Sequence, residues 1–234
     1  MPYDDAASAL LHEVVTDWAG AGILRPVRKV ISEVWPRNLD RYEPDLGDDA
    51  MTLGVQSGRN VRNLAVRMLQ EAGLDARIED QSLRVKHAGR VLHINKVSSM
   101  SPSWHVDSQR WDDSEVRQFG AQANSQAYFP TQGALFPVRA RDPQALQHLH
   151  LTWQGLEGGD TRAWIGFPRI GDTPWFAITP VAAEARAGRA GTPSTSPTTG
   201  SPKFDAMQVR EPSINLKVSR GEHASAGTTG SSRQ

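Results

Sequence analysis

The sequence predicts an α+β fold in which N-terminal helices pack on a mainly antiparallel sheet, followed by a disordered C-terminal tail. Apolar residues recur at helical spacing in the first third of the chain and alternate with polar residues further on. After Pro180 the composition changes to Ala, Gly, Ser, Thr and Pro, with too few large apolar side chains to offset chain entropy. We therefore expect one globular domain over residues 1–181 and a flexible, low-complexity tail over residues 182–234.

Three helices are expected before the first strand. Residues 5–19 repeat apolar side chains at helical spacing, and Gly20 and Gly22 end that pattern. Residues 25–34 form a second, shorter helix that Pro36 should stop. The third, residues 57–72, has the clearest pattern, with apolar residues at i, i+3, i+4, i+7 and i+8.

The strands follow in two groups. Residues 82–87 and 90–97 alternate around the two-residue turn Ala88-Gly89 and predict a β-hairpin, preceded by a further strand at 76–79. A loop over residues 98–113, called the Trp loop below, and a short helix near 113–118 come next. Strands at 149–153, 162–167 and 175–179 are separated by Gly-rich turns, which favours an antiparallel meander.

Composition limits the classes of function. The 234 residues contain 26 basic and 26 acidic side chains, so no global field attracts nucleic acid or an anionic membrane. The absence of cysteine removes disulfides, thiolate metal sites and thiol catalysis. No apolar run approaches the roughly 18 residues that a membrane span needs, and the N-terminus is acidic. We expect a cytoplasmic protein without a cofactor and without a membrane partner.

One acidic segment invites comparison with metal-dependent nucleases of the PD-(D/E)xK class. That chemistry needs carboxylates to hold a divalent cation and a lysine near the attacking water. The candidate residues are Glu43, Asp45, Asp49 and Lys96. The motif is broken, because Ile94 stands where an acid should precede Lys96 by two residues. We keep the nuclease as an alternative and favour a solvated acidic turn.

A second alternative is nucleic-acid binding through basic residues of the third helix and the hairpin. The candidates are Arg59, Arg62, Arg67, Lys86 and Arg90. Such residues contact phosphates when they share one surface. Acidic residues lie between them in the sequence, so we favour the simpler interpretation that these charges keep the domain soluble.

Two features offer sites for a protein partner. Trp104 and Trp111 lie in the Trp loop, where a large aromatic side chain either folds back onto the sheet or anchors a partner. The tail contains an apolar island at residues 203–219, typical of a docking segment. Its apolar residues include Phe204, Met207, Val209, Ile214 and Leu216.

The histidines give little sign of a metal. His148 and His150 alternate on one predicted strand and so point the same way, but no third ligand lies nearby in the sequence. His93 on the hairpin has no recognisable partner. We predict no metal site.

The segment from Arg41 to Gly54, with the pattern R-Y-x-P-x-L-G-D-D-A-x-T-x-G, resembles a group of actinobacterial proteins with no assigned function. The likeness extends to Ile94-Asn95-Lys96, to residues 123–126 and to Trp164-Ile165-Gly166. It implies a single domain over most of residues 39–179 and no activity. The leading hypothesis is therefore a non-enzymatic regulatory or accessory protein that binds another protein.

Overall fold

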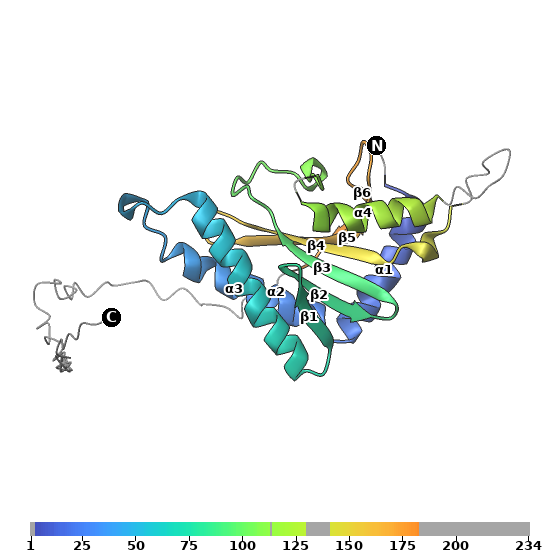
Figure 1. The fold of residues 1–234 in the computed structure, drawn as a ribbon, viewed down its shortest axis with the longest axis horizontal. Coiled ribbons are helices and arrows are strands. Elements are labelled where there is room, and N and C mark those ends of the chain that lie inside the picture. The colour runs from blue at the N-terminus through green and yellow to red at the C-terminus, as the bar shows by residue number, and fades with distance from the viewer. Residues whose placement is uncertain (1–2, 113, 130–140, 183–234) are drawn as a thin grey trace, which may run out of the picture. The chain divides into compact units, whose positions relative to one another are not determined.

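The computed structural model describes residues 3–112, 114–129 and 141–182. The chain divides into residues 1–188 and residues 189–234, and every described residue belongs to the first part. That part has helices packed on a six-stranded, mainly antiparallel sheet, which confirms the α+β class (Figure 1). The predicted tail lies outside the described residues, as does the docking segment at 203–219.

Within the described residues four α-helices form where helices were expected; the first is one residue longer than predicted and the other three are longer by six residues or more. They are α1 (Asp5–Gly20), α2 (Leu24–Leu39), α3 (Ala50–Glu71) and α4 (Glu115–Tyr128). Short 3-10 helices lie at η1 (Pro44–Leu46), η2 (Val106–Ser108) and η3 (Pro143–Ala145).

The prediction that Pro36 stops the second helix was wrong. α2 continues past Pro36 to Leu39, although proline removes one backbone donor. Beyond Pro36 the buried side chain of Asn38 donates to Ser57 and accepts from Asn60, both on α3. These hydrogen bonds fix the last turn of α2 against α3, so tertiary contacts compensate for the lost donor.

The six strands follow the chain order in the sheet, from one edge to the other. They are β1 (Asp75–Glu79), β2 (Ser82–His87), β3 (Arg90–Lys96), β4 (His148–Gly155), β5 (Thr161–Pro168) and β6 (Trp175–Pro180). All neighbours pair antiparallel except β3 and β4, which run parallel. A parallel pair needs a crossover, and this one contains the Trp loop and α4.

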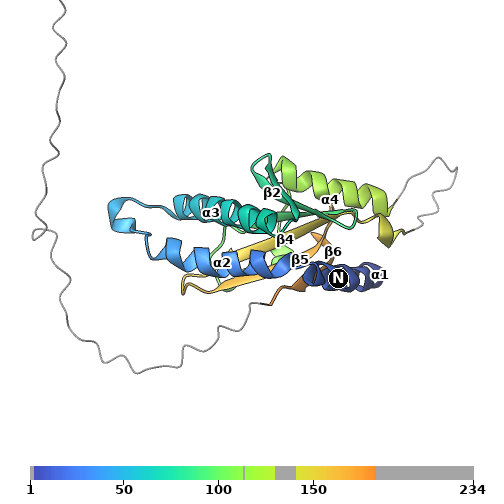
Figure 2. The same ribbon diagram turned by 90° about the horizontal axis from the view of Figure 1, so that it is seen from below.

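Helices cover both faces of the sheet. α4 lies above the strands and α2 below them, as Figures 1 and 2 show from two directions. α2 packs chiefly against α3, and α1 lies against β5 and β6. The period-two alternation of β4 separates the two faces, because Leu149 and Leu151 join the main core while His148 and His150 face α4.

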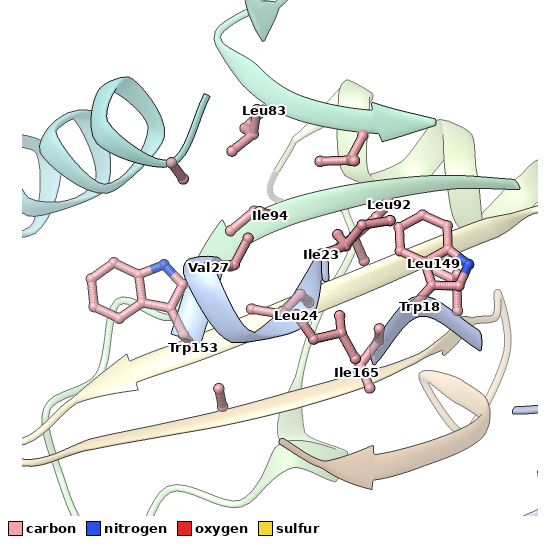
Figure 3. Close-up of a cluster of buried hydrophobic side chains, with 14 of the residues drawn as sticks. Trp18, Ile23, Leu24, Val27, Leu83, Leu92, Ile94, Leu149, Trp153 and Ile165 are labelled. Carbon is pink, nitrogen blue, oxygen red and sulfur yellow. The ribbon is translucent and has the colours of Figure 1, made fainter. Parts of the chain in front are cut away.

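The main core lies between the sheet and the first three helices. Trp18, Ile23, Leu24 and Val27 meet strand residues there, including Leu92, Ile94, Leu149 and Ile165 (Figure 3). A smaller core lies on the other face, where Trp111 packs with Val106, Ala121 and Trp175. The Trp loop is therefore held by apolar contacts of its own.

Candidate functional site

An open groove of about 1010 Å³ lies along the N-terminal half of α3. We call it the α3 groove. Its other walls come from the β1–β2 turn, the end of β3, the Trp loop and the first turn of α4. These segments are distant in the sequence, so the sequence pattern alone does not bring them together.

Lys96 lies in this groove because the alternation of β3 places it on the helix side, after Leu92 and Ile94. Its Nζ lies 5.0 Å from the ring centroid of Trp35 and 5.6 Å from that of Trp153. It donates to the carbonyl oxygen of Val97 over 3.0 Å. Burial lowers the pKa of Lys96 to about 8, because the charged amine is partly withdrawn from water.

Arg59 and Arg62 line the same groove from α3. Residues three apart on a helix share a face, and burial together with the charge of Arg59 lowers the pKa of Arg62. Nε of Arg62 is buried, and no described residue accepts its hydrogen. Within the described residues no carboxylate lies within ion-pair distance of Arg59, Arg62 or Lys96.

The acidic side chain on the groove wall is Asp80, and it is already paired. Its carboxylate accepts from Arg84 over 2.6 Å. Arg110 and Arg117 also line the groove, and Arg110 is paired with Asp112. The α3 groove is thus strongly positive in a chain whose formal charge is zero.

An apolar lip borders these charges. Met51 and Val55 lie four residues apart on α3, line the groove and are 76% and 62% exposed. Leu46, in the preceding 3-10 helix, is 80% exposed. Large apolar side chains exposed together next to a groove are typical of a binding surface.

The two loop tryptophans have different surroundings. Trp104 lines the groove and packs against Trp164 with ring centroids 5.6 Å apart. Trp111 is only 4% exposed, and its indole N–H donates to the carbonyl of Pro174. The prediction that Trp111 anchors a partner therefore needs correction, because the ring is buried inside the fold and cannot contact a partner. The alternative expectation, that the loop folds back onto the sheet, agrees with the position of Trp111.

The acidic residues of the nuclease alternative do not line the groove that contains Lys96. Asp49 caps the N-terminus of α3 by accepting from the backbone N–H of Thr52. Asp45 is exposed within η1, and Glu43 precedes it. Lys96 lines the α3 groove whereas Glu43, Asp45 and Asp49 do not. In the described part of the chain no group of three or more His, Asp or Glu is placed to hold a metal ion.

Only some of the basic residues proposed for nucleic-acid binding line the groove. Arg59 and Arg62 lie in the groove, while Arg67, Lys86 and Arg90 do not line it. Arg67 donates to the carbonyl of Asn63, and Arg90 donates to the carbonyl of Leu146. The apolar tail residues Phe204, Met207, Val209, Ile214 and Leu216 lie outside the described residues.

Sequence reasoning missed a cluster of three histidines beneath α4, of which His93 and His150 are buried. His148 and His150 do point the same way, and the parallel register places His93 directly opposite His150. Nε2 of His93 lies 3.3 Å from Nδ1 of His148, and the rings of His93 and His150 are 5.0 Å apart. Burial, together with the charges of His148 and Arg84, lowers the pKa of His93 to about 3.

Comparisons of the chain with family models, with curated proteins and with solved structures find no match. Among the described residues, every helix is too short or too polar to cross a bilayer. Inference about function must therefore start from the residues of the site.

Proposed function

We propose that this chain is a non-enzymatic accessory protein that binds a segment of another protein in the α3 groove. The observation that carries the proposal is the apolar lip of Met51 and Val55 beside a groove of about 1010 Å³. Exposed apolar side chains cost solubility unless a partner covers them. A polypeptide segment presents apolar and charged side chains at short spacing, which suits this surface.

The chemistry of the groove favours binding over catalysis. Lys96 is held by two indole rings and a backbone carbonyl. No histidine lines the groove, and its carboxylate Asp80 is engaged with Arg84. General acid–base chemistry needs a positioned pair of proton donor and acceptor, and among the described residues Lys96 is paired with neither a carboxylate nor a histidine.

The occupant is better sought in another protein than in the tail of this chain. The apolar island at residues 203–219 has three basic side chains, Lys203, Arg210 and Lys217, against two acidic ones, Asp205 and Glu211. With three basic and two acidic side chains the island has a net charge of +1, so a positive groove gives it no net attraction. An acidic or otherwise anionic segment would be attracted to it.

Co-purification with matched variants tests the proposal. The full chain is tagged and compared with the double variant Met51→Asp/Val55→Asp, which makes the lip charged. Ile170→Asp is the control, because Ile170 is also an exposed apolar residue, 42% exposed, but does not line the groove. We expect a polypeptide that co-purifies with the wild type and Ile170→Asp but not with the double variant. Equal recovery with all three folded proteins would contradict the proposal.

A further inference from the structure

The α3 groove has positive charges without counter-charges. Arg59, Arg62 and Lys96 have no carboxylate within ion-pair distance among the described residues. Burial of a charge is costly unless an opposite charge accompanies it. Lys96 is half-buried, and Arg62 has a buried Nε without an acceptor. Both observations indicate that an anionic ligand belongs in the groove.

The position of Lys96 makes it accessible to such a ligand. Gly54 of α3 lies opposite, and a Cβ built there would be 3.7 Å from Nζ of Lys96. Because glycine has no side chain, α3 does not block access to the Lys96 amine at this position. Ser98, Ser108 and Ser114 also line the groove, and their hydroxyl groups can donate further hydrogen bonds to an oxyanion.

We infer that Arg59, Arg62 and Lys96 form a binding site for a phosphate monoester on a side chain of the bound segment. This inference rests on the proposed function and names the group that the partner presents. A phosphate monoester carries about −1.5 to −2 charges and three acceptor oxygens near pH 7, which matches three cations better than a single carboxylate does. Arginine forks bind two phosphate oxygens while lysine provides a point charge.

A nucleic acid fits these residues less well. A phosphate backbone requires cations spaced along an extended track, whereas Arg67, Lys86 and Arg90 do not line the groove. The groove also carries the exposed Met51 and Val55 beside its cations. Arg59, Arg62 and Lys96 thus share one groove with an apolar contact, while the other basic candidates lie outside it.

The experiment uses the full chain and two probes, inorganic phosphate and O-phospho-L-serine, with L-serine, which lacks the phosphate group, as the comparison. Binding is followed by the backbone amide signals of Gly54, Gly58 and Val97. We expect saturable binding of both phosphates and none of serine. Lys96→Met, which keeps an unbranched chain between the two indoles, and Arg62→Gln should each weaken binding at least tenfold. Lys86→Met and Arg67→Gln are the matched controls and should bind as the wild type does.

A pH series separates binding at Lys96 from a structural effect. The series uses O-phospho-L-serine, because its phosphate monoester has a second pKa near 6 and is already doubly charged above pH 7. Because the pKa of Lys96 is about 8, its charge is lost as pH rises through that value, and the affinity for phosphoserine should fall between pH 7 and pH 9. In Lys96→Arg, whose guanidinium stays charged, affinity should stay level over this range. Equal affinities in Lys96→Met and Lys86→Met, or a flat wild-type profile, would overturn the inference.

The outcome is independent of the co-purification experiment. Phosphate binding by the chain alone, without a co-purifying polypeptide, would leave the anion site standing and remove the proposed function. If a polypeptide co-purifies in a manner that depends on the apolar lip, but no phosphate binds, the proposed function stands and the anion site is removed. Tighter binding of a single-stranded oligo(dT) than of phosphoserine, lost in the same variants, would overturn the inference in favour of a nucleic acid.

Discussion

Trp111 of the Trp loop and Trp175 of β6 connect the loop to the sheet, because each donates a hydrogen bond to the segment that contains the other. Their rings meet edge to face with centroids 4.8 Å apart. The indole of Trp111 donates to the carbonyl of Pro174, and the indole of Trp175 donates to the carbonyl of Val106 in the loop. Each tryptophan thus binds the backbone of the other's segment, and the loop is held as a wall of the α3 groove.

Replacing Trp111 should therefore destabilise the whole domain. Trp111→Ala removes a large buried ring and one of the two hydrogen bonds that the carbonyl of Pro174 accepts, the other coming from the N–H of Arg169. We expect a loss of about 3–5 kcal/mol. Trp104→Ala is the comparison, because Trp104 is only partly buried and should cost less. Urea unfolding of the three proteins measures both effects, and equal midpoints for the two variants would contradict this account of the loop.

The sequence predicted the local elements well and the long-range pairing poorly. The hairpin was predicted because the alternation of β2 and β3 and the turn Ala88-Gly89 are adjacent in the chain. The parallel pairing of β3 with β4 was not predicted, since the partners are separated by the Trp loop and α4. The early start of α3 was missed because Gly54 interrupts its helical pattern; in the structure Asp49 caps the helix.

Gly120 of α4 should not tolerate a side chain. A Cβ at this position would lie 2.8 Å from Nε2 of His150 and 3.4 Å from Cβ of His148. Overpacking of this kind typically costs about 1–3 kcal/mol, so Gly120→Ala should lower the free energy of unfolding by that amount. Gly58→Ala on α3 is the matched control: its Cβ meets nothing within 4 Å, and it should stabilise the protein by about 0.5–1 kcal/mol. A stabilising Gly120→Ala would show that α4 does not pack as described.

The histidine cluster should make the fold sensitive to acid. Burial lowers the pKa values of His93, His148 and His150, with contributions from neighbouring histidines and from Arg84 or Arg117. Below pH 6.5 the unfolded chain takes up protons at these positions while the folded chain does not, so stability falls as pH decreases. For His93, with a folded pKa of about 3, the loss between pH 6.5 and pH 5 is about 2 kcal/mol.

Urea unfolding at a series of pH values measures this slope. His93→Leu should flatten it between pH 6.5 and pH 5, whereas His12→Gln should leave it unchanged because His12 is exposed on α1. The test compares how the free energy of unfolding changes with pH, because this slope reports proton uptake; a different absolute stability of His93→Leu does not affect it. Identical slopes in all three proteins would mean that the folded chain protonates His93 as readily as the unfolded chain does, and would contradict this prediction.

Asn124 should be essential for the start of β4. Its Nδ2 donates to the carbonyls of His148 and Pro168, and its Oδ1 accepts from the N–H groups of Gln147 and His148. Asn124→Ala leaves buried backbone groups without partners and should cost about 3 kcal/mol. Gln126→Ala, an exposed position on the same helix, should be close to neutral. A thermal unfolding comparison tests the difference.

The candidate site was predictable only in parts. Arg59 and Arg62 were candidates as basic residues of one helix in the nucleic-acid alternative, and Lys96 was a candidate as the lysine of the nuclease alternative. Their convergence in one groove depends on packing between α3 and the sheet, which no local pattern contains. Trp111 was a candidate anchor because a loop tryptophan looks exposed in sequence, while its donor finds a carbonyl 63 residues away.

Site-specific photo-crosslinking tests the central claim, that the α3 groove binds a polypeptide. A photoreactive residue is placed at position 55, on the apolar lip, and in a second protein at position 67, which is exposed on the same helix but does not line the groove. Both are expressed in the cells from which the chain derives, and the products are separated by mass. We predict a discrete crosslinked polypeptide from position 55 and none from position 67. Equal crosslinking from both positions, or none from position 55, would contradict the claim.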